Sequence, residues 1–234
     1  MDLNLTIKLF ARVVTLLLVL PVHEAAHALT AKLFGDNTAE NQGRISLSPF
    51  VHLDPIGSML MLLTGFGWAK PVSVEPRNMK NPRAGLAVTA LAGPLSNLIA
   101  AFAAGLINAC IKCTASGRDA LYNYVVYDKI STTYCVLLLT EFLMLVNIGL
   151  AIFNLIPIPP LDGFNVMRFF TGPKVDRWFY QHYQQIQMGF LIFLLVLNFD
   201  LIPDKYNPLL AAQNAVFDWM WDLLMKIPEK KWGY

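Results

Sequence analysis

The chain has 234 residues, of which 56% are hydrophobic and 15% are charged, and its mean hydropathy is +0.48. Soluble domains carry about 25% charged residues, so this composition indicates a membrane protein. It excludes a disordered chain, because charge is low, and 3 cysteines exclude a disulfide-stapled scaffold. A net charge of +2 gives no support to nucleic-acid binding.

Four apolar stretches are long enough to cross a bilayer, whose hydrocarbon core of about 30 Å requires about 20 helical residues. They run from Leu5 to Phe34, between Arg83 and Lys112, between Lys129 and Asp162, and between Arg177 and Asp200, the last being most apolar from Ile186 to Ile202. We therefore expect an all-α polytopic membrane protein with about four transmembrane helices, three of which form the catalytic core.

Three other segments are expected to lie beside the spanning helices. Ile56–Trp68 is apolar, but about a dozen residues rising 1.5 Å each reach only about 18 Å, which favours a re-entrant or interfacial segment. Gly43–Leu53 alternates in part between β-branched and polar residues, a weak strand or hairpin signal. Asn207–Ile227 mixes tryptophan and leucine with acids, which suggests an amphipathic helix on the membrane surface.

The chemistry is concentrated in the sequence His23-Glu24-Ala25-Ala26-His27 at the end of the first apolar stretch. Residues four apart on a helix share a face, so both imidazoles can reach one Zn²⁺ at about 2.0–2.1 Å. The glutamate beside the first histidine can then act as general base on a water at the metal. Two core histidines and an interfacial glutamate are the structural alternative, but such groups are costly inside an apolar helix without a partner.

A catalytic zinc site needs a third protein ligand and an open position. The soluble metzincin pattern would put a histidine where Leu33 stands, so the third ligand must be remote. The best candidate is Asp162, which follows a proline-rich break in the third apolar stretch, where unwound backbone can line a cavity. Glu40 and Asp54 are nearer in sequence but lack that setting. A solvated aspartate in a helix-terminating loop is the alternative.

Other polar residues admit two interpretations each. Thr140, Asn147 and Asn154 are seven apart and share a helix face, where they either line a polar cleft or make hydrogen bonds between helices. His52 and Asp54 have the composition of a turn, and the alternative is that they contact the metal site.

Three blocks in this order resemble the site-2 protease family of intramembrane zinc metalloproteases. They are His23–His27, the run Ala92-Gly93-Pro94-Leu95-Ser96-Asn97, and Asn154-Leu-Ile-Pro-Ile-Pro-Pro-Leu-Asp162-Gly163. The resemblance covers roughly residues 15 to 170 and is to small prokaryotic members. It implies that His23, His27 and Asp162 bind zinc, that Glu24 is the catalytic base, and that Asn154 assists substrate or transition-state binding.

From the residues and the resemblance together we expect a zinc metalloendopeptidase that cleaves peptide bonds within or near transmembrane segments of other proteins. Residues 1–170 would form the protease core, and residues 171–234 a transmembrane helix and a surface helix. The expected partners are the lipid bilayer and a membrane-protein substrate, with no nucleic acid, and the expected location is the cytoplasmic membrane of a prokaryote. A metal or ion transporter and an inactive zinc-binding membrane protein are the alternatives.

Overall fold

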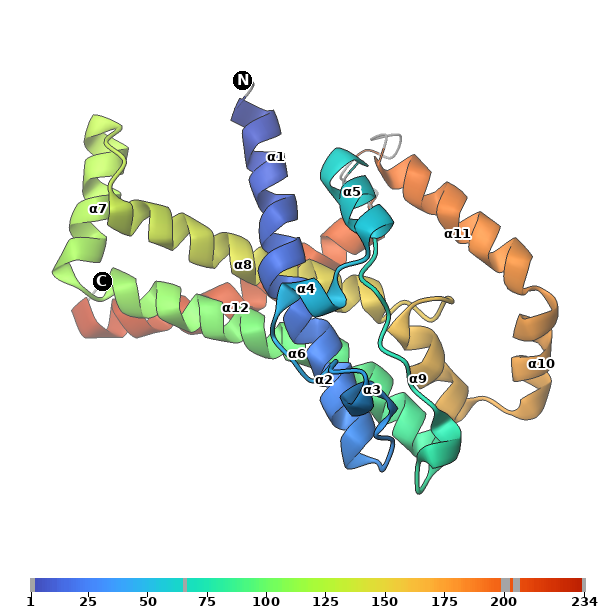
Figure 1. Ribbon diagram of the computed structural model, residues 1–234. Helices are drawn as coiled ribbons and strands as arrows, with labels where there is room; N and C mark the ends of the chain where they lie inside the picture. The colour runs from blue at the N-terminus through green and yellow to red at the C-terminus, as the bar shows by residue number, and fades with distance from the viewer. Residues whose placement is uncertain (1–2, 65–66, 199–202, 204–206, 233–234) are drawn as a thin grey trace. The chain divides into compact units, whose positions relative to one another are not determined.

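The computed structural model describes residues 3–64, 67–198, 203 and 207–232 (Figure 1). Within these ranges every regular element is a helix, and the β contact is an isolated antiparallel bridge between Leu53 and Ala69. The chain divides into two compact units, one of residues 1–97 and 150–207 and the other of residues 98–149 and 208–234. The all-helical class expected from the sequence is confirmed.

The first unit begins with a long apolar helix whose winding changes once. α1 (Leu3–Val14) continues through a π-helical turn (Thr15–Val19) directly into α2 (Leu20–Leu33). Single π-helical turns inside α-helices are frequent at functional sites. This turn ends four residues before His23.

The remaining elements of the first unit are shorter helices and the ends of two long ones. They are α3 (Thr38–Asn41), α4 (Pro49–His52), α5 (Pro55–Thr64), a 3₁₀ turn (Pro76–Asn78), the first half of α6 (Pro82–Lys112), the last turn of α8 (Thr132–Asn154), α9 (Asp162–Phe170), α10 (Pro173–Gln181) and α11 (Tyr183–Asn198).

The short apolar helix α5 packs against the first long helix. Leu16, Leu20 and Ala69 form a buried cluster against which side chains of α5, including Met61 and Leu62, are packed. The Arg12 guanidinium donates to the carbonyls of Leu62 at 2.7 Å and of Leu63 at 3.1 Å. These bonds satisfy two of the carbonyls that the end of α5 leaves without partners within the helix.

The strand or hairpin expected over Gly43–Leu53 is wrong. Pro49 begins a helical turn there instead, as its fixed φ favours at the first helical position. The buried Arg44 side chain donates to the carbonyls of Val51 and Lys70 and so takes acceptors that a ladder would use. The β pairing in this region is limited to the isolated bridge between Leu53 and Ala69.

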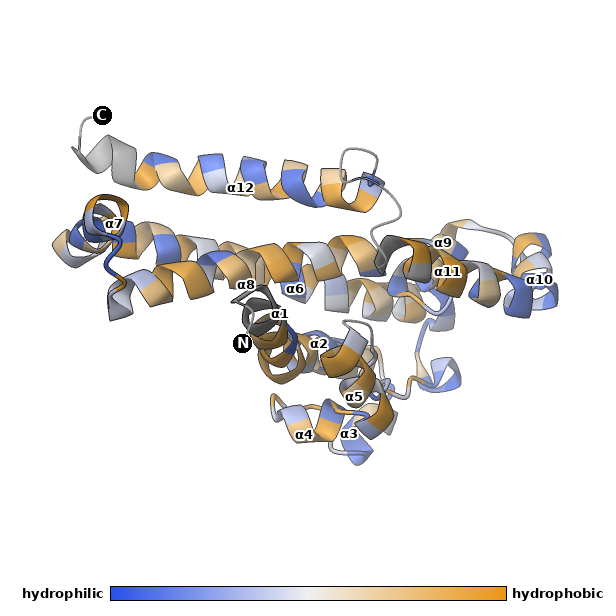
Figure 2. Cartoon of the chain, turned by 90° about the horizontal axis from the view of Figure 1, so that it is seen from above, coloured by the Kyte–Doolittle hydropathy of each residue, from blue (hydrophilic) through white to orange (hydrophobic). Residues whose placement is uncertain are grey.

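The second unit consists of the second half of α6, α7 (Ala115–Tyr127), most of α8, and α12 (Pro208–Trp232). The helix expected over residues 207–227 is therefore present as α12. Its apolar residues lie on more than one side, because Met220 and Leu224 are buried while Trp219 is exposed. Figure 2 shows hydrophilic and hydrophobic residues interleaved along α12.

Three helices in the described part of the chain are long and apolar enough to cross a membrane: Leu9–Leu33, Pro82–Lys112 and Thr132–Asn154. They coincide with the first three stretches expected from the sequence, and Figure 2 shows the hydrophobic colour dominating α1 and α2. The fourth expected stretch is represented by α11, which has 16 residues. The remainder of that stretch, residues 199–202, lies outside the described residues.

Candidate metal centre

The two histidines of the motif lie on one face of α2 and point at the same place. Their Nε2 atoms are 3.0 Å apart, and the exposed fractions are 4% for His23 and 8% for His27. The rings meet edge to face, with centroids 4.6 Å apart. If both Nε2 atoms carry lone pairs rather than protons, they cannot hydrogen-bond to each other, and a cation placed between them would satisfy both.

Asp162 completes this cluster from a different part of the chain. α8 ends at Asn154, the proline-rich segment 155–161 is irregular, and Asp162 is the first residue of α9. Its Oδ2 atom lies 3.2 Å from His23 Nε2 and 3.3 Å from His27 Nε2. Among the described residues, these three form the group of ligand-type side chains with the spacing of a metal site.

The spacing of the three atoms fits a tetrahedral zinc ion. With zinc-to-ligand bonds of about 2.0–2.1 Å, neighbouring ligand atoms of a tetrahedron lie about 3.3–3.4 Å apart. The three separations here are 3.0, 3.2 and 3.3 Å. Asp162 Oδ2 is also shielded from solvent without a well-formed hydrogen bond, which is the state of an oxygen that is placed for a metal. Two imidazoles and one carboxylate leave one tetrahedral position open.

The electrostatics of Asp162 agree with this arrangement. Burial raises the pKa of the Asp162 carboxyl, but the neighbouring imidazoles of His23 and His27 outweigh burial and lower it to about 2. The carboxylate is therefore ionised at neutral pH, as a metal ligand must be. The far end of α9 is held by Arg83, which donates to the carbonyls of Arg168 and Thr171.

Gly163 is needed for space rather than for unusual torsions. Among the described glycines, positive φ occurs only at Gly35 and Gly43, so Gly163 has an ordinary backbone conformation. A Cβ at Gly163 would lie 2.1 Å from Leu155 O and 2.6 Å from Ile156 O. The glycine thus lets α9 pack on the unwound segment and brings Asp162 toward the histidines.

Glu24 and Asn154 lie near the cluster in sequence but do not belong to it. Glu24 is partly exposed on α2 and, among the described residues, makes no hydrogen bond or ion pair. Its role as general base therefore stays a prediction. Asn154 donates back to Leu150 O at 3.0 Å in its own helix, so its expected contact with substrate remains a prediction.

Thr140 and Asn147, which share a helix face with Asn154, differ in their hydrogen bonds. Thr140 Oγ1 accepts from Asn108 Nδ2 at 2.9 Å, a hydrogen bond between α8 and α6. Asn147 donates to Leu143 O within α8 at 2.8 Å. At Thr140 the structure therefore supports the alternative of hydrogen bonding between helices over a polar cleft.

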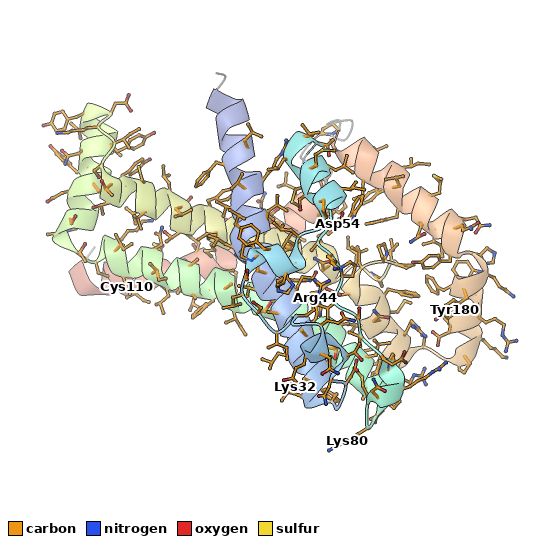
Figure 3. The ribbon with its side chains drawn as sticks, in the orientation of Figure 1. Lys32, Arg44, Asp54, Lys80, Cys110 and Tyr180 are labelled. Carbon is orange, nitrogen blue, oxygen red and sulfur yellow. The ribbon has the colours of Figure 1, made fainter. Side chains whose placement is uncertain are left out.

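The acids nearer in sequence are engaged elsewhere. Glu40 pairs with Lys32 at 2.5 Å, and Asp54 Oδ1 accepts from Gly57 N at 2.7 Å at the start of α5. Figure 3 shows Asp54 at that helix and Lys32 near the end of α2. His52, also expected in a turn, is buried with Nε2 donating to Ser46 O at 2.7 Å.

Sequence reasoning missed the part that α6 plays. His27 Nδ1 is 2.7 Å from Thr89 O, the Asn97 amide is 3.1 Å from His23 Nδ1, and Gly93 lies against both rings. Gly93 and Asn97 belong to the run Ala92–Asn97 that resembles the site-2 protease family, but the sequence assigned them no role, and it assigned none to Thr89. Their spacing of four residues, which puts them on one helix face, was the available signal.

The protein combines apolar helices of membrane-spanning length with a His-Glu-x-x-His motif and a remote aspartate at ligand spacing. This is the architecture of a membrane metallopeptidase. Comparison with known proteins agrees. The model of peptidase family M50 matches residues 11–197. The chain belongs to peptidase family M50, the site-2 protease family of zinc metallopeptidases.

Two relatives illustrate the match. YwhC, a candidate zinc metalloprotease of Bacillus subtilis (strain 168), is 37% identical over 185 residues, which cover 79% of this chain and 78% of YwhC. Rip2, a candidate zinc metalloprotease of Mycolicibacterium smegmatis (strain ATCC 700084 / mc(2)155), is 27% identical over 186 residues, which cover 77% of this chain and 64% of Rip2. No solved structure matches the chain.

Proposed function

We propose that this metallopeptidase cleaves peptide bonds within or near transmembrane segments of substrate proteins, with His23, His27 and Asp162 as zinc ligands and Glu24 as general base. The observation that carries the proposal is the convergence of two buried imidazoles and one carboxylate at 3.0–3.3 Å. Both histidines lie inside Leu9–Leu33, a helix of membrane-spanning length. This position of the histidines supports cleavage within or near a membrane-embedded segment of the substrate.

The donor set fits the ion, and the chain supplies the remaining chemistry. Zinc bound there supplies Lewis acidity that polarises the scissile carbonyl and makes a water acidic enough to attack near neutral pH. Glu24 accepts the proton of the attacking water and passes it to the leaving amine nitrogen. Asn154, at the last position of α8 before the proline-rich segment, is assigned to substrate binding, where its amide can turn from Leu150 O to a substrate backbone group.

The test uses the purified full chain in detergent, with zinc content and cleavage of membrane-protein substrates measured on the same preparations. Wild-type protein should carry about one zinc per chain. Glu24→Gln should keep the zinc and lose hydrolysis by about 10²–10⁴-fold, because only proton transfer is removed. Zinc-free active wild-type protein would contradict the metal assignment, and a fully active Glu24 variant would contradict the assigned base.

A further inference from the structure

One face of α6 contacts both candidate metal-binding imidazoles. Thr89, Gly93 and Asn97 are four residues apart, so they form a line along the helix. We call these three residues the α6 support. Each of them contacts one ring or both.

Thr89 fixes which nitrogen of His27 carries the proton. Its main-chain carbonyl lies 2.7 Å from His27 Nδ1. A carbonyl oxygen only accepts hydrogen bonds, so Nδ1 is the donor and holds the proton. In the neutral imidazole the other nitrogen, Nε2, then carries a free lone pair. That nitrogen is the one facing His23 and Asp162.

Asn97 occupies the equivalent place beside His23. It is 0% exposed, its Nδ2 atom lies 3.1 Å from His23 Nδ1, and its Oδ1 atom is buried without a hydrogen-bond partner among the described residues. A half-turn of the amide exchanges these two atoms, and the buried, unpartnered oxygen favours that exchange. An amide can present either its oxygen or its NH₂ group to that nitrogen. If the oxygen faces Nδ1, that nitrogen is protonated and Nε2 is free to bind a metal. If the NH₂ group faces Nδ1, the proton moves to Nε2 and metal binding there is blocked.

Gly93 lies between these two contacts and allows α6 to approach. A Cβ at this position would lie 2.4 Å from His27 Nε2 and 2.6 Å from His23 Cε1. Both distances are far below ordinary van der Waals contact, so even a methyl group would push the rings from their places. The absence of a side chain at Gly93 thus lets α6 approach closely enough for Thr89 and Asn97 to contact the rings.

We propose that the α6 support sets the metal-binding form of both histidines, with the Asn97 carbonyl oxygen accepting from His23 Nδ1 as the Thr89 carbonyl accepts from His27 Nδ1. Asn97 is thus a positioning residue, which holds one ligand in the correct tautomer and orientation without touching substrate. This inference rests on the zinc site of the proposed function. Loss of such a hydrogen-bonding partner weakens metal affinity about 10–100-fold.

The experiment measures Zn²⁺ affinity of the full chain in detergent by competition with a chromophoric chelator, and the visible spectrum of the Co²⁺-substituted protein. Asn97→Leu, which cannot accept a hydrogen bond, should bind Zn²⁺ about 10–100-fold more weakly and alter the Co²⁺ spectrum. Asn97→Asp offers only acceptors when ionised, so it should retain affinity within a few-fold of wild type.

Asn108→Leu is the matched control. Asn108 lies on the same helix, is also 0% exposed, and donates to Leu137 O at 2.8 Å and Thr140 Oγ1 at 2.9 Å. Its loss should lower thermal stability and leave Zn²⁺ affinity unchanged. Gly93→Ala should lower Zn²⁺ affinity, whereas Gly189→Ala, where a Cβ meets nothing within 4 Å, should not.

The outcomes separate this inference from the proposed function. If wild-type protein binds Zn²⁺ and Asn97→Leu binds it as tightly as Asn108→Leu does, the positioning role is wrong while the zinc site stands. If Asn97→Asp loses as much affinity as Asn97→Leu, the acceptor assignment is wrong. If wild-type protein binds no Zn²⁺, the inference falls together with the proposed function. The inference is supported if Asn97→Leu and Gly93→Ala bind Zn²⁺ weakly while Asn97→Asp, Asn108→Leu and Gly189→Ala bind it with nearly wild-type affinity.

Discussion

At the scale of single residues, the remote position of Asp162 is the feature on which the metal site depends most. Its carboxylate is 139 residues beyond His23 in sequence and 3.2 Å from it in space. Asp162→Ala should therefore weaken Zn²⁺ binding and abolish cleavage, because a two-histidine site lacks the third protein ligand of catalytic zinc. Zinc content and cleavage rate measure this directly.

Asp54→Ala is the comparison for that variant. Asp54 caps the start of α5 through Gly57 N at 2.7 Å, so its loss should cost about 1 kcal/mol of stability and leave zinc content unchanged. A protein that keeps its zinc after Asp162→Ala but loses it after Asp54→Ala would reverse the assignment.

Gly163 gives a second prediction at this scale. In Gly163→Ala the new Cβ would lie 2.1 Å from Leu155 O and 2.4 Å from Leu155 C. Main-chain atoms cannot yield as a side chain can, so segment 155–161 must shift and carry Asp162 away from the histidines. We expect at least tenfold weaker Zn²⁺ binding, measured by chelator competition. Gly172→Ala, which meets nothing within 4 Å, is the control, and equal affinities in the two variants would refute the spatial role.

At the scale of elements, the loop after α2 is tied to the extended segment after residue 69 by one buried carboxylate. Asp36 is 0% exposed and accepts from Thr38 Oγ1 at 2.5 Å, Glu75 N at 2.7 Å and Asn78 Nδ2 at 3.0 Å. Burial raises the pKa of Asp36, but these hydrogen bonds outweigh burial and hold its pKa below the ordinary value.

This shift predicts a dependence of stability on pH. Because the folded-state pKa of Asp36 lies below the unfolded value of about 3.9, its contribution is complete above that value and is lost as pH falls through the folded pKa. Asp36→Asn should be less stable than wild type at pH 7 by about 1–3 kcal/mol.

The difference in unfolding midpoint between wild-type protein and Asp36→Asn should shrink below about pH 4. Thermal unfolding in detergent from pH 7 to pH 3 measures it, with the exposed Asp119→Asn as control. A gap that is absent at pH 7, or that widens on acidification, would contradict the role of Asp36.

The sequence predicted those elements whose conformation depends on local residue pattern. It missed the features that depend on contacts between residues far apart in the chain. The length of the apolar stretches predicted the first three long helices, and the proline run before Asp162 predicted the break between α8 and α9. The strand expected over residues 43–53 failed because Arg44 and Pro49 impose a helical turn. The α6 support joins residues 62 to 74 apart in sequence, and only the register of two packed helices reveals such a pairing.

At the scale of the whole molecule, a site placed in a membrane-spanning helix sets the form that a substrate must take. A regular transmembrane helix keeps its peptide carbonyls in hydrogen bonds to residues four positions away. Attack on such a carbonyl requires the substrate segment to be extended locally. We therefore expect Gly, Asn or Pro near the cleavage position to raise the cleavage rate and a run of Leu to lower it, and folded soluble proteins to be poor substrates.

A series of variants of one substrate helix, cleaved in detergent or liposomes, measures this requirement. Each variant should retain membrane insertion, so that only the helical propensity near the scissile bond changes. If poly-Leu variants are cleaved as fast as Gly-containing ones, local unwinding is not required, whatever the outcome at the zinc site.

The central claim is that one zinc ion is held by two imidazoles and one carboxylate, and zinc K-edge X-ray absorption of the purified chain tests it most directly. The site of His23, His27 and Asp162 predicts two imidazole nitrogens and oxygen scatterers at about 2.0–2.2 Å, with no sulfur. His27→Ala should lose the zinc. Sulfur scattering at about 2.3 Å, which would indicate ligation by the free cysteines Cys110, Cys113 or Cys135, or the absence of zinc from active protein, would contradict the claim.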